Sequence, residues 1–231
     1  MSEKRPLESA PIAFFDLDLT LLWTNSAHLW LRRARRKKKV SKRFLVKGAF
    51  WLLLYRLGVS RLERVLEKGV ASLQGLNEAE LERSIHEFWE EEVSHTLRDR
   101  GRKAIKKHHE RGERCVLLTS SSVYIARHAQ RELGLDDIVS TVFEVTDGHL
   151  TGRTKGPMCY GEGKLSLAKA YADQYKTPLS ECAFYTDSYS DVSVLEQVGR
   201  PVVVNADPRL KRFAERKGWP VVDWDESIEE G

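Results

Sequence analysis

The sequence predicts an α/β protein with a Rossmann-like parallel sheet and an inserted all-helical domain. From Leu97 onward, short apolar runs alternate with helical periodicity, which is typical of a parallel sheet covered by helices. Between Leu22 and Leu97 the pattern is helical throughout, without a strand signal. We therefore expect a disordered tail at 1–10, a core made of 11–22 and 98–231, and a helical domain at 23–97.

The first predicted strand, at 12–15, ends on two acidic residues. Its aromatic and branched side chains suit a buried strand, and Asp16 and Asp18 follow where α/β sheets present their strand ends to ligands. Alternate residues of an extended segment point the same way, so both carboxylates can converge on one site. Two such anions need a cation, which favours an oxygen-bound divalent metal such as Mg2+. A pair of surface acids that opens a loop is the alternative.

In the helical domain, Asn25 or Ser26 can cap a first helix. Ser41 can open a second helix, and Asn77 with Glu80 has the spacing of a capping box. Apolar residues then recur on one helical face, which predicts a small core of the domain's own: Leu81, Ile85, Trp89 and Val93.

The remaining core elements alternate along the chain. We expect helices over 98–111, 122–133, 164–175, 190–198 and 208–217. Strands are expected over 115–119, 182–185, 201–205 and 221–224. An extended piece at 141–145 precedes Asp147-Gly148, a strong two-residue turn signal, and the chain returns over 149–153 as a hairpin.

The positive charge is concentrated in one run. The formal net charge is +4, and nine cations without an acid lie between Arg32 and Arg43, so the rest of the chain is slightly acidic. No nucleic-acid partner is expected from so local a patch. An apolar stretch follows to Leu57 that is too short and too charged to span a bilayer. The segment from Arg32 to Leu57 is therefore either a peripheral contact to anionic lipid or a solvated basic face beside a buried helix, and we favour the second.

The cysteines indicate a reducing compartment. Cys115, Cys159 and Cys182 are odd in number and have no Cys-x-x-Cys spacing, which favours buried reduced thiols over disulfides or metal ligands. The first residues are polar and lack an apolar stretch, so no secretory signal is expected. A cytoplasmic location follows as the expectation.

Polar groups that suit phosphate chemistry stand at other predicted strand ends and helix starts. Thr119, followed by Ser120, ends a strand where a hydroxyl and free N–H groups can hold a phosphate. Lys164 follows a glycine-rich loop, and Asp187 and Asp191 follow the strand at 182–185. Each alone has an ordinary explanation, a helix cap for threonine or aspartate and a solvent-exposed side chain for the lysine. Their joint placement with the first two acids weakens these separate explanations.

On these motifs the chain resembles the haloacid dehalogenase (HAD) superfamily, whose hallmarks are a D-x-D-x-T/V loop, a Thr or Ser, a Lys and a loop with paired acids. The resemblance covers roughly residues 12–224 and is strongest with subfamily IB, the phosphoserine-phosphatase-like branch. It rests also on C-Y-G-E-G-K at 159–164, T-D-S-Y-S-D at 186–191 and V-N-A-D-P-R-L at 204–210. It implies that residues 23–97 form a C1-type cap over the site.

The resemblance also implies a Mg2+-dependent phosphatase that forms an aspartyl-phosphate with a small phosphorylated substrate. Asp16 would be the nucleophile and Asp18 the acid and base. Mg2+ would be held by Asp16, Asp18 through its backbone carbonyl, and Asp187, with Asp191 supporting the metal or Lys164. The groups that bind the phosphoryl oxygens would be Thr119, Ser120 and Lys164.

One departure from the resemblance bears on the substrate. Asn25 stands where phosphoserine phosphatases carry a Glu that pairs with the substrate's amino group, and an amide cannot neutralise an ammonium ion. Phosphoserine is therefore disfavoured, and Asn25 becomes a candidate specificity residue on the cap side. Smaller departures are Ser190 in place of Asn and Thr186 in place of Gly.

Two other functions stay open at this point. One is a phosphotransferase or mutase that uses the same aspartyl-phosphate. The other is a protein without catalytic activity that binds a membrane or an acidic partner through the basic segment. The intact set of acids favours an enzyme over the second alternative.

Overall fold

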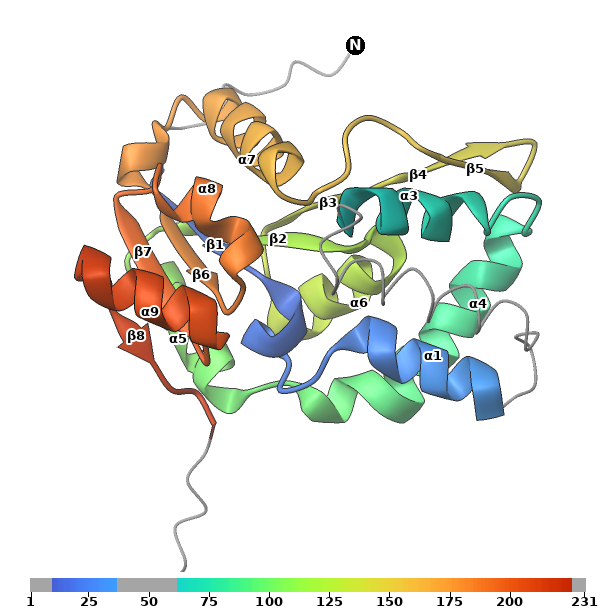
Figure 1. The fold of residues 1–231 in the computed structure, drawn as a ribbon, viewed down its shortest axis with the longest axis horizontal. Coiled ribbons are helices and arrows are strands. Elements are labelled where there is room, and N and C mark those ends of the chain that lie inside the picture. Colours follow the sequence, from blue (N-terminus) through green and yellow to red (C-terminus); the bar gives the residue numbers. More distant parts are fainter. Residues whose placement is uncertain (1–9, 37–61, 226–231) are drawn as a thin grey trace, which may run out of the picture.

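The computed structural model describes residues 10–36 and 62–225 of the chain (Figure 1). Several predictions fall outside this part: the tail at 1–9, the helix expected from Ser41, and most of the segment from Arg32 to Leu57. At the start of the described part, Ala10 accepts a hydrogen bond through its carbonyl oxygen from the Thr177 hydroxyl at 3.1 Å. Among the described residues no helix is long and apolar enough to cross a membrane.

A six-stranded parallel sheet forms the centre of the molecule, in the order β3-β2-β1-β6-β7-β8. The strands are β1 Ile12–Phe15, β2 Arg114–Ser122, β3 Asp137–Thr141, β6 Ala183–Thr186, β7 Arg200–Val204 and β8 Val221–Val222. Because all six run the same way, their carboxyl ends share one edge of the sheet. The first strand lies between β2 and β6, so its last residue is central on that edge.

Helices cover both faces of this sheet, as the alternating pattern predicts. Ile12 and Phe14 pack on the side covered by α7 Glu162–Gln174, α8 Val192–Leu195 and α9 Pro208–Lys217. Ala13 and Phe15 point to the opposite side, toward α5 Asp99–Glu110 and α6 Val123–Leu133. All four strand residues are fully buried, which explains their continuous apolar run. The predicted fold class is confirmed.

Three element predictions need correction. The sequence pattern does not predict β3, because Asp137, Ser140 and Thr141 make it polar, yet its edge position beside β2 tolerates that. The second strand continues through Ser122 with an irregular register after Thr119, so α6 begins at Val123. The helix expected at 190–198 is reduced to a 3-10 turn, Tyr189–Asp191, and the short α8.

The described part of 23–97 consists of helices and turns. The helices are α1 Ser26–Arg36, α3 Leu62–Ala71 and α4 Glu78–Phe88, and α4 continues through a π-helical turn, Trp89–Val93, and a 3-10 turn, Ser94–Thr96. The Asn77 side chain accepts a hydrogen bond from the backbone N–H of Glu80, which confirms the predicted cap of α4.

The described residues of this segment do not form the separate core that the sequence predicts. Ile85, Trp89 and Val93 are buried in the same apolar cluster as Phe15 of the sheet and Ile125 of α6. The apolar face of α4 therefore packs against the core domain, because the core offers more apolar surface to α4 than the short helices of the inserted segment do.

A hairpin from the core extends beside the inserted segment (Figure 1). It consists of β4 Phe143–Thr146 and β5 His149–Thr154, joined by the predicted turn at Asp147-Gly148. Leu150 exchanges backbone hydrogen bonds with the loop between α3 and α4, donating to the Leu76 carbonyl oxygen and accepting from Gly75 N–H. The hairpin thus fixes the position of these two helices.

Most of the described end of the basic run agrees with the favoured interpretation, because Arg32, Arg35 and Arg36 are exposed, and Arg33 is the exception. Arg33 is buried rather than solvated or lipid-facing, and its guanidinium donates to carboxylates of Glu91 and, at 2.7 Å, Glu92. Arg36 also pairs with Glu92, at 2.6 Å. These two cations hold α1 against the turn that follows α4.

Candidate active site

Four charged side chains meet at the carboxyl edge of the sheet. Asp16 follows β1 directly, Asp187 follows β6, and Lys164 lies in the first turn of α7. The ammonium group of Lys164 donates to Asp16 Oδ1 at 3.0 Å and to Asp191 Oδ2 at 2.7 Å. The structure therefore brings together the predicted Asp16, Lys164 and Asp191, with Asp187 beside them in the same buried edge.

This cluster holds more negative than positive charge. Burial and the nearby Asp16 and Asp191 raise the pKa of Asp187 to about 8. Burial also raises the pKa of Asp16, although Lys164 opposes the shift. Burial alone would lower the pKa of Lys164, but Asp16 and Asp191 outweigh it and raise that pKa, so the lysine is cationic. One ammonium thus serves three buried carboxylates.

Asp18 occupies a more open position than Asp16. Its side chain is half-buried and accepts two hydrogen bonds, from the backbone N–H of Ser26 at 2.5 Å and from the Ser121 hydroxyl at 2.7 Å. Ser26 begins α1 and Ser121 lies near the end of β2, so Asp18 is held between the inserted segment and the sheet. A carboxylate fixed in this way and open on one side is suited to moving protons.

The backbone after Asp18 takes an unusual turn. Leu19 has φ of +62°, a left-handed conformation that a leucine adopts rarely. The guanidinium of Arg98 stabilises this turn, because its Nη1 donates to the carbonyl oxygens of Leu19 at 2.6 Å, Thr20 at 3.2 Å and Leu22 at 3.1 Å. Arg98 is itself buried and pairs with Asp225. It is a positioning residue for the loop that carries both candidate catalytic acids.

The other predicted site residues lie around this centre. Thr119 is buried at the same strand edge, and its Oγ1 accepts a hydrogen bond from the backbone N–H of Ser121, which in turn binds Asp18. Ser120 is exposed, and its carbonyl oxygen accepts from the Thr141 hydroxyl. Asn25 is half-buried, and its Oδ1 accepts from the backbone N–H of His28 at 3.0 Å, so it caps α1 as the sequence indicates.

Several residues of the site have no role in the sequence-based prediction. Thr20 donates to Asp187 Oδ1 at 3.1 Å, and Thr186 donates to Asp191 Oδ2 at 2.7 Å. Thr20 is the threonine of the D-x-D-x-T pattern and could have been found from that pattern. Ser26, Ser121 and Arg98 carry no such signal, because their contacts depend on how distant segments meet.

The donor set fits a hard divalent cation. Asp16 and Asp187 are buried carboxylates that follow adjacent strands. In the described part of the chain, Lys164 is the one cation within hydrogen-bond distance of either carboxylate, and it contacts Asp16. Uncompensated buried carboxylates are costly, and oxygen ligands of this kind are those preferred by Mg2+. The residues that would hold it are Asp16 and Asp187, with the carbonyl of Asp18 as the third predicted ligand.

This fold and this edge of acidic side chains define a hydrolase of the phosphatase kind built on a Rossmann-like parallel sheet, and comparison with known proteins places the chain in a family. The family model of haloacid dehalogenase-like hydrolases matches residues 13–196. The chain is 31% identical over 223 residues to a phosphoserine phosphatase of Mycobacterium tuberculosis, covering 95% of this chain and 72% of that protein. It is 29% identical to a histidinol-phosphatase of Neisseria meningitidis, covering 92% of this chain and 98% of the relative.

A solved structure agrees with these relatives. The crystal structure of a protein of unknown function from Bordetella pertussis matches with a TM-score of 0.85 at 27% identity, covering 94% of this chain and 99% of that one. The chain therefore belongs to the haloacid dehalogenase-like hydrolases. The expected superfamily and enzyme class are confirmed.

Proposed function

We propose that the protein is a Mg2+-dependent phosphomonoester phosphatase that works through an aspartyl-phosphate. The observation that carries this proposal is the buried Asp16, held by Lys164 at 3.0 Å at the central strand end with Asp187 on the adjacent strand. A carboxylate there is fixed in one orientation and faces a cation that can also neutralise phosphate oxygens.

The chemistry follows in two steps. An oxygen of Asp16 bonds to phosphorus as the bond from phosphorus to the leaving oxygen breaks, and Asp18 gives that oxygen its proton. Asp18 then takes a proton from water, whose oxygen bonds to phosphorus and releases Asp16 and inorganic phosphate. Lys164 binds phosphoryl oxygens through its ammonium group, with Thr119 and the N–H groups at Ser120 as further donors. Asp16, Asp187 and the backbone carbonyl of Asp18 would hold Mg2+, and the ion would neutralise charge that develops on the phosphoryl group.

Supporting residues keep these groups in place. Asp191 accepts from both Lys164 and the Thr186 hydroxyl, so it fixes the lysine's direction. Ser121 and Ser26 N–H hold Asp18. Holding Lys164 and holding Asp18 require no contact with substrate, so we assign Asp191, Ser121 and Ser26 as positioning residues.

For the substrate we propose a small O-phosphorylated 2-amino alcohol. This class includes the compounds named in the two relatives, phosphoserine and histidinol phosphate. Asn25 is the specificity residue of the proposal, because it directly precedes Ser26, whose N–H binds Asp18. Its neutral amide offers no charge to the ammonium group that both compounds carry, so we expect Asn25 to contact this group as a hydrogen-bond acceptor and not as a countercharge.

Phosphate release from a substrate panel tests this function. The panel contains phosphoserine, histidinol phosphate, 2-aminoethyl phosphate, a sugar phosphate and p-nitrophenyl phosphate, each with and without Mg2+. We expect release that needs Mg2+ and that disappears in Asp16→Asn. Release by the wild type that persists in this variant would refute the nucleophile. If only sugar phosphates react, the mechanism stands and the amino alcohol class is wrong.

The phosphotransferase alternative is separated by the same assay with added alcohol acceptors. Water as the acceptor gives free phosphate in proportion to substrate consumed, whereas transfer gives a new ester instead. A cytoplasmic location completes the proposal, because Cys115, Cys159 and Cys182 are all free and buried in the structure.

A further inference from the structure

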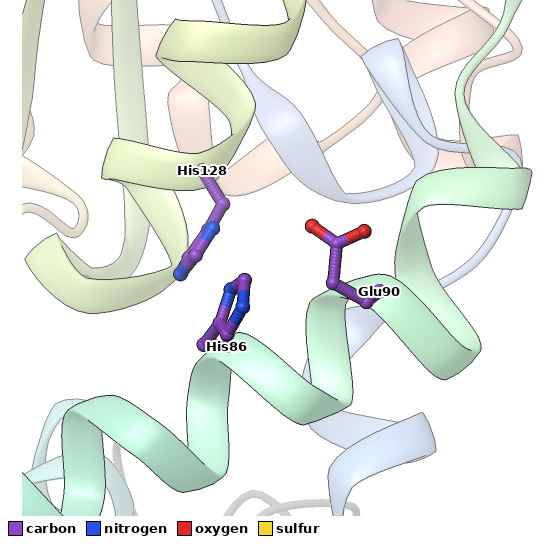
Figure 2. A group of neighbouring side chains, drawn as sticks. All are labelled: His86, Glu90 and His128. Atoms are coloured by element: carbon purple, nitrogen blue, oxygen red, sulfur yellow. The ribbon is translucent and has the colours of Figure 1, made fainter.

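A second group of metal-binding side chains lies away from the carboxylate edge. His86 of α4, Glu90 one helical turn later, and His128 of α6 each offer a ligand atom, and these atoms all lie within 4.8 Å of one another. Figure 2 shows His86 and Glu90 rising from one face of their helix, with His128 reaching toward them from α6. The i and i+4 spacing places the first two side by side.

These three side chains are available for a ligand. Among the described residues none of them has a hydrogen-bond or ion-pair partner at its side chain. The centroids of the His86 and His128 rings are 5.4 Å apart, and those of the Trp89 and His128 rings are 5.8 Å apart, with the rings stacked in both pairs. These two contacts hold the imidazole of His128 in place. His86 and Glu90 are exposed, which leaves a path for an ion from solvent.

The surroundings of His128 also suit a metal. Burial lowers the pKa of His128, with further contributions from Arg131 and His86, so its imidazole is neutral at pH 7. A neutral imidazole is the form that binds metal. The opposing contributions come from Glu90 and Glu132, the nearest acids.

We propose that His86, Glu90 and His128 form a binding site for a transition metal ion of the Zn2+ type, which joins α4 to α6. Two imidazoles and one carboxylate are the donor set that Zn2+, Co2+ and Ni2+ accept, leaving water in the remaining positions. In a tetrahedral site, bonds of roughly 2.0–2.2 Å place ligand atoms about 3.3–3.6 Å apart, so the exposed His86 and Glu90 need to move by up to about 1.5 Å.

The site differs in chemistry from the proposed Mg2+ site. Mg2+ prefers oxygen ligands, whereas imidazole selects the later transition metals. The two sites should therefore be filled independently. The ion would add a link between α4 and α6 to the existing ones, the bond from Tyr124 to Glu78 at 2.9 Å and the ion pair of Arg127 with Glu82 at 3.1 Å.

A second cluster in the described part serves as the comparison. His109, Cys115 and Asp136 also offer ligand atoms within 4.8 Å of one another. There, however, burial raises the pKa of the Cys115 thiol to about 12, and Asp136 already accepts from Cys115 N–H at 2.7 Å and contacts His109 at 3.0 Å. We expect this cluster to stay empty, since its acid is used and its thiol is protonated.

Calorimetric titration with Zn2+ in the presence of saturating Mg2+ tests the proposal. We expect one equivalent to bind to the wild type and to His109→Ala, and affinity to fall at least about tenfold in His86→Ala and in Glu90→Gln. Both of these positions are exposed, so the variants keep the fold. Absence of wild-type binding, equal binding in all variants, or loss confined to His109→Ala would each overturn the site.

Hydrogen exchange gives a readout of the link itself. Zn2+ should slow amide exchange in α4 and α6 of the wild type and leave it unchanged in Glu90→Gln. Slowing at the carboxylate edge instead would mean that Zn2+ enters the Mg2+ site and would contradict the proposal. Neither measurement depends on phosphatase activity.

Discussion

Two clusters of charged side chains lie at opposite ends of the parallel sheet, and the pKa values of acids in them shift in opposite directions. At the carboxyl end, Asp16, Asp187 and Asp191 share Lys164, and the pKa of Asp187 rises to about 8. At the amino end, Glu113 precedes β2 and pairs with Arg200, the first residue of β7.

The amino-end cluster is closed. Glu113 accepts from Arg200 at 2.7 and 2.9 Å and contacts His108 Nδ1 at 2.7 Å, while the other ring nitrogen of His108 meets the Tyr185 hydroxyl. The Arg200 hydrogen bonds outweigh burial and, with His108, lower the pKa of Glu113 to about 2. Burial lowers the pKa of His108, so the ring is neutral at pH 7.

The difference teaches what each cluster is for. The amino-end cluster satisfies its own charges and needs nothing from outside. The carboxyl-end cluster carries two acids more than its cation can match, a shortage of positive charge that bound Mg2+ would fill. Burial with incomplete neutralisation therefore marks the working site, and burial with complete neutralisation marks the structural one.

The largest effect expected is that of Asp16→Asn. Removing the nucleophile should lower kcat by at least about 10^4-fold, as for other residues that form covalent intermediates. Because the change also removes one uncompensated buried charge, the melting temperature should stay equal or rise. Activity and thermal unfolding are measured on the same preparation. A variant that stays active and is less stable than the wild type would show that Asp16 has a structural role and not the proposed catalytic one.

Glu113→Gln should show the opposite behaviour. At pH 7 we expect the free energy of unfolding to fall by about 2 kcal/mol, because Arg200 and His108 lose their charged partner, with little change in activity. The matched control is Glu196→Gln, which removes an exposed ion pair with Lys217 and should change stability by less than about 0.5 kcal/mol.

The same variant defines a pH dependence. The pKa of Glu113 is lower in the folded protein, about 2, than its ordinary 4.5, so its contribution is complete above about pH 4.5 and is lost as the pH falls toward 2. Urea unfolding of wild type and Glu113→Gln should therefore differ at pH 7 and converge only as the pH approaches about 2. A gap that is constant over this range would show that the effect is packing and not charge.

Asp187→Asn tests whether the shortage of positive charge is filled by metal. Mg2+ should raise the melting temperature of the wild type and support activity, and chelation should remove both effects. In the variant we expect Mg2+ affinity to be about 10–100-fold weaker. Asp173→Asn, an exposed acid of α7, is the control and should respond to Mg2+ as the wild type does.

The smallest effect expected is a change of selectivity in Asn25→Asp. Aspartate keeps the cap of α1, since Asp and Asn are equally good there, and adds a carboxylate on the cap side of the site. The ratio of kcat/KM for phosphoserine to that for p-nitrophenyl phosphate should rise up to about fivefold, which is the change that the free energy of one partly exposed ion pair would produce. Asn25→Ala, which lacks the charge, should leave the ratio unchanged; an equal rise there would remove Asn25 from the specificity assignment.

The centre of the site could be predicted from sequence because strand ends converge. Asp16, Lys164, Asp187 and Asp191 follow regular elements, and parallel strands bring such residues to one edge whatever the loops do. The contacts of Asp18 could not be predicted, because they join it to Ser26 and to Ser121, which lies 103 residues further along the chain.

The fold shows the same division. The buried strands were predictable from apolar runs, whereas β3 was not, since a polar edge strand lacks that signal. The described residues of 23–97 do not form the separate core expected for that segment, because periodicity shows that a helix face is apolar and does not show which surface it covers.

Arg98 ties two parts of the molecule into one mechanical unit. It follows Leu97, which pairs with Leu22 where the chain leaves and re-enters the core, and its guanidinium holds three carbonyl oxygens of the loop after Asp18. The arginine at the point where the chain re-enters the core therefore also sets the backbone path of the loop that follows Asp18.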